Sequence, residues 1–506
     1  DGAKTLTITS GAGNVDIAGI IGGTTAVGNT AINDSSGSGT IDILQIGDGT
    51  PAAGISGTLD IGNTATNQVE FDGTRYNIGG NVTVESKSGT HIDFTGADPS
   101  FTTTDASSTI SFSTGTIEIA NTGLTMSSNA GNISIGDIEG TADEDISINA
   151  GSGTLAVGAI GTGTANGINT VGLTSSTSIT LSGAISTSTS AGNNVTLTGP
   201  VIISGAVDID TDTTGADGTV EFTSTIVGDG SGGTTDNLTI DSGGSSITFG
   251  GTIGVAAPIA GFNVNQDGGT VALSIPQIGT AGGNAGTSGT TNIGTTSSTT
   301  VAMSAASYKF GGETNIKAAS ASTGITFSGA DPKVDTTDAN ITLTGPVVIS
   351  NGELDINSAG GNIEITGAIT SAGVDESLRL DDGTGTSGTI TLGSTASSGS
   401  INLIGDSGIS LSGNLASTAT ADGEINLTGP VTLAGNITID ADAQNTDVTF
   451  SSTINATSSG GQSLTIDTAA GNVAIQGAIG GSTALSALSI DDTDGAGTIE
   501  INDIGT

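Results

Sequence analysis

The chain has no cysteine and no tryptophan, and among its 506 residues one is histidine and two are tyrosine. Without cysteine no disulfide can form, so the fold does not depend on the redox state of its compartment. The single histidine, His91, excludes a metal site built from several histidines. Its place in the run HIDFTG predicts an outward strand residue. Because aromatic residues are only 2% of the chain, the interior must be built from Ile, Val, Leu and Ala.

Basic side chains are scarcer still than aromatic ones. Seven Lys and Arg residues stand against 50 Asp and Glu residues, which gives a net charge of −43. Nucleic acids need a basic surface that neutralises phosphates, so this composition predicts no nucleic-acid partner, and it disfavours anionic membrane surfaces. No apolar run approaches the roughly 18 residues of a membrane-spanning helix, so we expect no membrane insertion. The basic residues are scattered along the sequence, at Lys4, Arg75, Lys87, Lys309, Lys317, Lys333 and Arg379.

The sequence is rich instead in glycine, with 85 residues, and in short alternating runs. Glycine, serine and threonine at this level would also suit a disordered chain. The apolar residues, however, alternate with polar ones in runs such as NVDIAG, GTIDILQIG, NQVEFDG and GTIEIA, each bounded by Gly, Asn, Asp or Ser. This pattern predicts β-strands and turns throughout the chain and no convincing helix.

A long internal repeat is the strongest signal. The stretch Leu6–Gly22 returns at Leu238–Gly254 and again at Leu464–Gly480. The two tyrosines, Tyr76 and Tyr308, are separated by the same 232 residues as the first two copies. We therefore predict one continuous solenoid over residues 1–506, with super-repeats at 1–232 and 233–460 and a partial third copy at 461–506.

Self-similarity combined with short strands is typical of a solenoid, whose coils contact only their neighbours. At about 20 to 25 residues per coil, each super-repeat would hold roughly ten coils. With strands stacked about 4.8 Å apart, the chain would form an elongated rod on the order of 100 to 120 Å long. The predicted fold class is all-β, a parallel β-helix or β-solenoid. Tandem β-sandwich domains are the alternative, although they call for larger core residues and a shorter repeat.

Strands often open with Gly-Asn-Val or Gly-Asn-Ile. Gly and Asn tolerate a positive φ, which a tight corner between strands needs. Two interpretations of the asparagines stay open: stacking on asparagine of the next coil in a hydrogen-bonded ladder, or turn preference alone. The motif begins at Gly13, Gly80, Gly131, Gly361, Gly435 and Gly471.

Candidate sites are few. Asp208, Asp210 and Asp212 alternate in one acidic run, and such oxygen-rich loops are calcium-site candidates, although solvated turns would have the same composition. Calcium is the only cofactor that the sequence suggests, and none is required. Scattered basic residues and scarce aromatics give no support for sugar or polyanion chemistry, so we expect no enzyme activity.

The run GEINLTGPVTLAGNITIDADAQNTDVTFSSTINATSSGGQSLTIDTAAGNVAIQGAIGGSTALSALSI, from Gly423, resembles the repeat regions of very large bacterial exoproteins, the filamentous-haemagglutinin-like and autotransporter-like adhesins. The resemblance is one of composition and rhythm and covers essentially the whole chain. It implies a right-handed parallel β-helix shaft exported to the cell exterior. The secretion-domain motif of Asn-Pro-Asn-Gly type known from that family is not visible in this sequence, which leaves the export route open.

These observations together predict a non-enzymatic structural segment of a secreted or cell-surface fibre. We expect copies to associate end to end or laterally into a filament, sheath or surface layer. Because the first and last strands share one repeat register without polar caps, we also expect the chain to be cut from a longer array or to stack with copies of itself. The alternative is an adhesin stalk whose binding tip lies elsewhere, with contact to glycans or cell surfaces.

Overall fold

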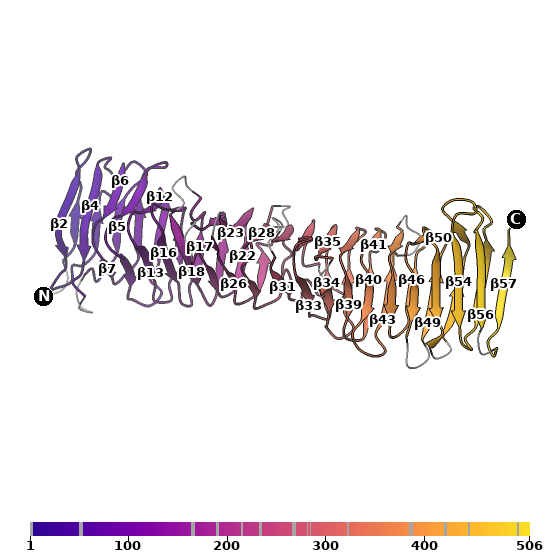
Figure 1. Ribbon diagram of the computed structural model, residues 1–506. Coiled ribbons are helices and arrows are strands. Elements are labelled where there is room, and N and C mark those ends of the chain that lie inside the picture. The colour runs from indigo at the N-terminus through magenta and orange to yellow at the C-terminus, as the bar shows by residue number, and fades with distance from the viewer. Residues whose placement is uncertain are drawn as a thin grey trace. The chain divides into compact units, whose positions relative to one another are not determined.

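The computed structural model of the chain is built of β-strands (Figure 1). It divides into two compact units, unit 1 (Asp1–Gly251) and unit 2 (Thr252–Thr506). No α-helix occurs in the part of the chain that it describes, and no helix there is long and apolar enough to cross a membrane. The described residues are 4–49, 54–162, 167–188, 192–213, 216–231, 235–265, 270–280, 282–283, 285–320, 323–383, 388–418, 423–443, 446–492 and 495–505.

Coils of unit 1 contribute strands to three faces, and the strands of each face pair in parallel with those of the neighbouring coils. Face 1 consists of β1 (Leu6–Ile8), β3 (Thr30–Ile32), β5 (Leu59–Gly62), β8 (Val82–Glu85), β11 (Ile110–Thr114), β14 (Ile133–Ile135), β17 (Thr154–Val157), β19 (Ser178–Leu181), β22 (Val201–Ile203) and β27 (Ile226–Gly228). Face 2 begins with β2 (Val15–Ile21), β4 (Thr40–Ile46), β6 (Gln68–Phe71), β9 (His91–Phe94), β12 (Thr116–Ile119) and β15 (Ile138–Gly140). Isolated bridges of Ile160 join β15 to the rest of this face, which consists of β20 (Ile185–Ser186), β23 (Val207–Asp210) and β28 (Asn237–Asp241).

The third face of unit 1 begins where β4 pairs with β7. It consists of β7 (Arg75–Ile78), β10 (Ser100–Thr103), β13 (Gly123–Ser127), β16 (Glu144–Asn149), β18 (Ile168–Thr174), β21 (Val195–Thr198), β26 (Val220–Phe222) and β29 (Ile247–Phe249). One short antiparallel pair, β24 (Asp212–Thr213) with β25 (Ala216–Asp217), projects from the corner after β23.

Unit 2 repeats the three faces. Face 1 consists of β30 (Gly261–Val264), β32 (Thr291–Ile293), β35 (Thr314–Lys317), β38 (Ile341–Thr344), β41 (Ile363–Ile365), β44 (Ile390–Leu392), β47 (Ile409–Leu411), β50 (Val431–Leu433) and β53 (Ile454–Ala456). Face 2 consists of β31 (Ala272–Ile275), β33 (Thr300–Met303), β36 (Gly324–Phe327), β39 (Val347–Ile349), β42 (Ile369–Ser371), β45 (Thr395–Ser397), β48 (Leu415–Ser417), β51 (Ile437–Ala441), β54 (Ser463–Thr468) and β56 (Ala487–Asp492). Face 3 consists of β34 (Ser307–Lys309), β37 (Lys333–Asp335), β40 (Glu353–Asn357), β43 (Ser377–Asp381), β46 (Ile401–Ile404), β49 (Glu424–Thr428), β52 (Asp447–Phe450), β55 (Val473–Ile479) and β57 (Ile499–Ile504).

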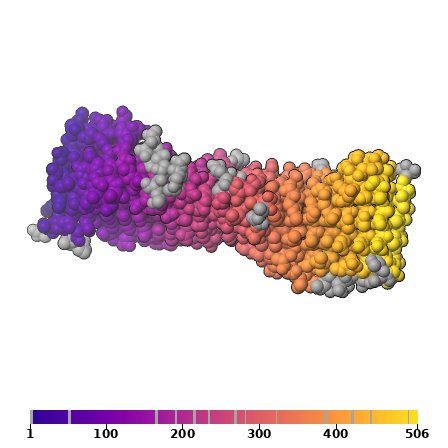
Figure 2. Space-filling model, viewed as in Figure 1, coloured from indigo at the N-terminus to yellow at the C-terminus, as the bar shows by residue number. Residues whose placement is uncertain are grey.

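This architecture confirms the predicted parallel β-solenoid, with about 19 turns over the two units. Tandem β-sandwiches are wrong, because the strand pairs that build the faces are parallel and join successive coils, whereas sandwich sheets are antiparallel. Within each unit, Figure 2 shows neighbouring segments of the chain as successive bands of colour. The first predicted super-repeat boundary, at 232 and 233, lies outside the described residues. The second, at Gly460 and Gly461, lies in the turn between β53 and β54.

Alternation along each strand builds the core. Inward residues of successive coils pair in register, as Ile41 does with Val69 and Val69 with Ile92, and all three are fully buried. Burial stabilises each such side chain by about 25 cal/mol per Å² of apolar surface. The expectation of an interior made from aliphatic residues alone is wrong, because both tyrosines and most phenylalanines are also fully buried.

The two tyrosines occupy equivalent positions in the two units. Tyr76 Oη accepts a hydrogen bond from Gly73 N–H at 2.7 Å, and Tyr308 Oη accepts one from Ala305 N–H at 2.7 Å. Burial raises the pKa of both phenols, and a backbone hydrogen bond opposes the rise. The repeat read from the sequence therefore reappears as a buried tyrosine with the same backbone hydrogen bond in each unit.

Neither interpretation of the Gly-Asn corners is correct. Asn132 Oδ1 accepts a hydrogen bond from the backbone N–H of Thr154 in the next coil at 2.9 Å, and Asn362 Oδ1 does the same with Thr389 at 2.9 Å. The glycine does not supply a positive φ here. A Cβ on Gly131 would instead meet the Ser108 carbonyl oxygen at 1.8 Å, so the close approach of the previous coil requires glycine. The asparagines of the other four motifs accept the same kind of bond, at Thr40, Thr109, Ser463 and Thr498.

Candidate metal centre

Face 2 of unit 1 carries a column of carboxylates, which we call the acidic ladder. Its members occupy the outward position between two inward apolar residues of their strands, as Asp93 does between Ile92 and Phe94. Parallel pairing brings this position into register on six successive coils, with about 4.8 Å between strands. The acidic ladder consists of Asp16, Asp42, Glu70, Asp93, Glu118 and Glu139.

Burial and charge crowding raise the pKa of two carboxyls of this ladder, Glu70 and Asp42. Burial raises the pKa of Glu70 to about 7, and repulsion from Asp72, Asp42 and Asp93 adds to the rise. Burial and the neighbouring Asp72 and Asp16 also raise the pKa of Asp42. Two full charges at this spacing repel each other by about 1 kcal/mol even in water. The ladder therefore favours whatever reduces its negative charge, a proton or a cation.

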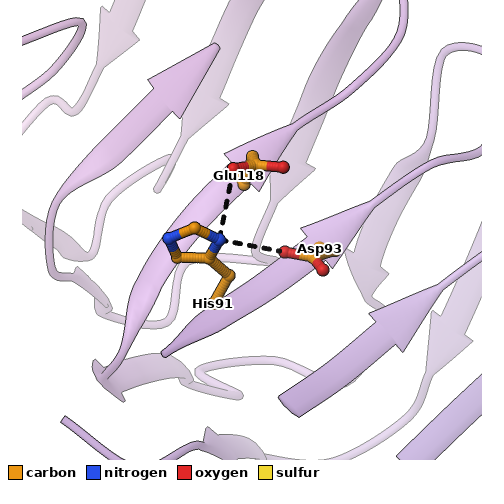
Figure 3. Close-up of side chains that lie close together, drawn as sticks. All are labelled: His91, Asp93 and Glu118. Atoms are coloured by element: carbon orange, nitrogen blue, oxygen red, sulfur yellow. Dashed lines mark ion pairs between the residues drawn. The ribbon is translucent and has the colours of Figure 1, made fainter. Parts of the chain in front are cut away.

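The histidine lies beside the middle of the ladder. His91 Nδ1 is 3.2 Å from Glu118 Oε2 and 3.9 Å from Asp93 Oδ1 (Figure 3). His91 and Asp93 are two residues apart on β9 and so point to the same side, while Glu118 comes from the neighbouring strand β12. One nitrogen and two carboxylate oxygens thus lie within 4.8 Å of one another. We call these three residues the His91 triad.

The surroundings hold Asp93 in one orientation. Gln68 Nε2 donates a hydrogen bond to Asp93 Oδ2, whereas Asp93 Oδ1 is buried and has no hydrogen-bond partner. The histidine ring is exposed. A shallow hollow of about 280 Å³, lined in part by Ser88, Gly89 and Thr116, adjoins the beginnings of β9 and β12. The His91 triad is therefore ordered on its protein side and open to solvent on the other.

The predicted calcium candidates lie farther along face 2. Asp208 and Asp210 are on β23, and Asp212 opens β24 at the following corner. Asp210 Oδ1 accepts a hydrogen bond from Asp212 N–H at 2.9 Å, and Asp210 pairs with Asp241 on β28. Within the described ranges, the group of three ligands that lies close enough for one ion is the His91 triad instead. Calcium at Asp208, Asp210 and Asp212 stays a prediction, and an unchanged melting temperature on calcium removal would contradict it.

A second charged cluster lies on face 3 of unit 2. Asp355 accepts hydrogen bonds from Lys333 Nζ at 2.7 Å and from Arg379 NH1 at 2.7 Å, and Arg379 also contacts Asp381. Lys333, Asp355 and Arg379 come from three successive coils in register. The hydrogen bond to Asp355 raises the pKa of Lys333, against the effect of burial. Two basic residues that look scattered in the sequence thus share one carboxylate, and Asp381 supplies a second one to Arg379.

Sequence reasoning found His91 as an outward strand residue, which is where it lies, but missed its partners. A signal was present, because the runs VDI, IDI, VEF, IDF and IEI each place one acid between two apolar residues. What was missing is the register that sets these runs side by side. Searches of protein-family models, curated proteins and solved structures find no match to this chain.

Proposed function

We propose that the chain is a non-enzymatic structural segment of a secreted or cell-surface fibre in which copies associate end to end. The resemblance to exported bacterial β-helix shafts supports this proposal. The acidic composition is compatible with it, since strong charge of one sign favours solubility.

The observation that carries the proposal is the last coil of unit 2. Val473 and Ile479 on β55 are 1% and 3% exposed, whereas their register partners on β57, Ile499 and Ile504, are 48% and 66% exposed. A coil in the same register would bury both and pair with the outer edge of β57. In the proposed end-to-end association, a second copy of the chain supplies such a coil.

The first coil of a second copy has a suitable pattern. Leu464–Gly480, the stretch whose strands pair with β56 and β57, is a copy of Leu6–Gly22. A coil of this sequence therefore has inward apolar residues that can stack on the inward apolar residues of the last coil. Because the chains carry a charge of −43 each, we expect association to strengthen as salt screens their repulsion.

Electron microscopy and analytical ultracentrifugation of the full chain test the proposal. We expect end-joined particles whose fraction rises with protein and salt concentration, and we expect Ile504→Lys to abolish them. Val374→Lys is the matched control, because Val374 is also exposed but lies in the turn between β42 and β43.

A chain that stays monomeric at high salt and high concentration would contradict this proposal. Monomers that bind glycans or cells would favour an adhesin stalk. Electron microscopy of the native assembly would also distinguish end-to-end from lateral contacts.

A further inference from the structure

Asp93 Oδ1, which has no hydrogen-bond partner, needs an explanation. Asp93 as a residue is only 8% exposed, and its Oδ1 lies in the buried part without a hydrogen-bond donor. A buried carboxylate oxygen without a partner is costly, and native structures rarely leave one so. This oxygen faces the Nδ1 atom of His91. A cation between them would satisfy it.

The spacing of the His91 triad fits a small divalent ion. With bonds of about 2.1 Å and tetrahedral angles, two ligand atoms of one zinc ion lie about 3.4 Å apart. The observed separations, 3.2 Å from His91 Nδ1 to Glu118 Oε2 and 3.9 Å to Asp93 Oδ1, lie on either side of that value. Only small side-chain movements are therefore needed to reach bonding distances.

The ligand types select among ions. Calcium and magnesium prefer sites made wholly of oxygen, whereas an imidazole nitrogen favours zinc and the neighbouring divalent transition metals. Two carboxylates neutralise the ion, and Gln68 orients Asp93 as an outer-shell partner orients a ligand. The open side of the triad leaves room for water as the fourth ligand.

We propose that His91 Nδ1, Asp93 Oδ1 and Glu118 Oε2 bind one divalent transition-metal ion of the zinc class. The ion links β9 to β12 and so cross-links two successive coils of unit 1. It also places positive charge in the middle of the acidic ladder, where six carboxylates repel one another. Unit 2 serves as a comparison. The positions that correspond to the His91 triad are Gly324, Thr326 and Val348, which offer no comparable ligands.

The single histidine makes the test direct, because every imidazole signal in a nitrogen-15 spectrum of the full chain comes from His91. One equivalent of Zn²⁺ should move the Nδ1 resonance and leave Nε2 as the protonated nitrogen. Isothermal titration should find one tight zinc site. His91→Ala and Glu118→Gln should each weaken it at least about tenfold, and Gln68→Ala by about tenfold or more through loss of Asp93 orientation. Glu221→Gln, which removes a charge from face 3, should change the affinity less than about threefold.

Three outcomes would overturn the proposal. An Nδ1 resonance that does not respond to Zn²⁺ would show that His91 only donates a hydrogen bond to Glu118. Equal weakening by Glu118→Gln and Glu139→Gln, with none by His91→Ala, would show diffuse attraction of cations to the ladder. Displacement of Zn²⁺ by an equal concentration of Ca²⁺ would show an all-oxygen site. These results do not depend on whether copies of the chain join end to end.

Discussion

Unit 1 and unit 2 bury a tyrosine at positions 232 residues apart, with the same backbone hydrogen bond, but the residues packed around them differ. In unit 1, Tyr76 stacks on Phe101 with 5.4 Å between ring centroids, and Phe71 stacks on Phe94 at 5.0 Å. In unit 2 the positions of Phe71 and Phe101 are taken by Met303 and Val334. Both sets are fully buried. The core of a coil can therefore be built from aromatic or aliphatic side chains without a change of strand register.

The charges differ more than the cores. The column of unit 2 that corresponds to the acidic ladder is neutral, and it consists of Ser274, Ala302, Thr326, Val348 and Thr370. Conversely, the Lys333, Asp355 and Arg379 cluster of unit 2 corresponds to Ser100, Thr125 and Ser147 in unit 1. Outward positions of a shared frame thus carry independent charge patterns, because an outward side chain does not determine how coils stack.

The largest expected difference concerns the core. Phe101→Ala should destabilise unit 1 by about 3 to 5 kcal/mol, through lost burial and the cavity left among aromatic rings. The equivalent change in unit 2, Val334→Ala, removes fewer atoms and should cost about 2 kcal/mol. Tyrosine fluorescence during urea unfolding can report each unit separately, with Tyr76 alone in a Tyr308→Phe background and Tyr308 alone in a Tyr76→Phe background. Equal losses would contradict this prediction, because the larger volume removed from unit 1 would then have no effect on stability.

The charged cluster of unit 2 should show the next largest effect. Asp355→Asn leaves Lys333 and the partly buried Arg379 without their shared carboxylate, which we expect to cost about 2 kcal/mol. The equivalent residue of unit 1, Thr125, is exposed, and Thr125→Ala should change stability by less than about 0.5 kcal/mol. The same two fluorescence backgrounds measure both changes. A cost for Asp355→Asn as small as that for Thr125→Ala would show that the cluster is merely solvated surface.

The corner asparagines should behave alike in both units. Asn132→Ala and Asn436→Ala each remove one hydrogen bond to the backbone of the next coil, so each should cost about 1 kcal/mol. Amide hydrogen exchange at Thr154 and Ser463 should accelerate in the respective variants. Clearly unequal losses would mean that the corners are not equivalent parts of a shared frame.

The acidic ladder should make unit 1 sensitive to pH. The pKa of Glu70 in the folded chain, about 7, lies above its ordinary value of 4.5, so its ionisation destabilises the fold. The penalty is fully present above pH 7, fades as the pH falls toward 4.5, and is absent below that value. Glu70→Gln should therefore stabilise unit 1 at pH 8 by about 1 kcal/mol, after allowance for solvent screening, and have little effect near pH 4.5.

Urea unfolding of Glu70→Gln at the two pH values measures this effect, with zinc removed so that metal binding does not contribute. Ala302→Gln on the neutral column of unit 2 is the control, and its effect should not vary with pH. A Glu70→Gln effect that is the same at both pH values would contradict the raised pKa.

Much of the fold could be predicted because its determinants are local. A run such as VEF assigns two residues to the core and one to the surface whatever the neighbouring coil is, since strand side chains alternate. The prediction failed at the corners, where Gly131 is required by the approach of Ser108 rather than by a positive φ. That contact joins residues on different coils, and no local pattern contains it.

For the candidate site, too, some features could be predicted from the sequence and others could not. By itself the sequence determined that the chain forms strands, that the frame repeats after about 230 residues, and that His91 and Asp93 point to one side of β9. Only the tertiary structure decided that Glu118 joins them, and that Lys333 and Arg379 meet at Asp355. The reason is register: corners of unequal length separate successive strands, so the residue that stacks on Asp93 depends on how a whole coil closes.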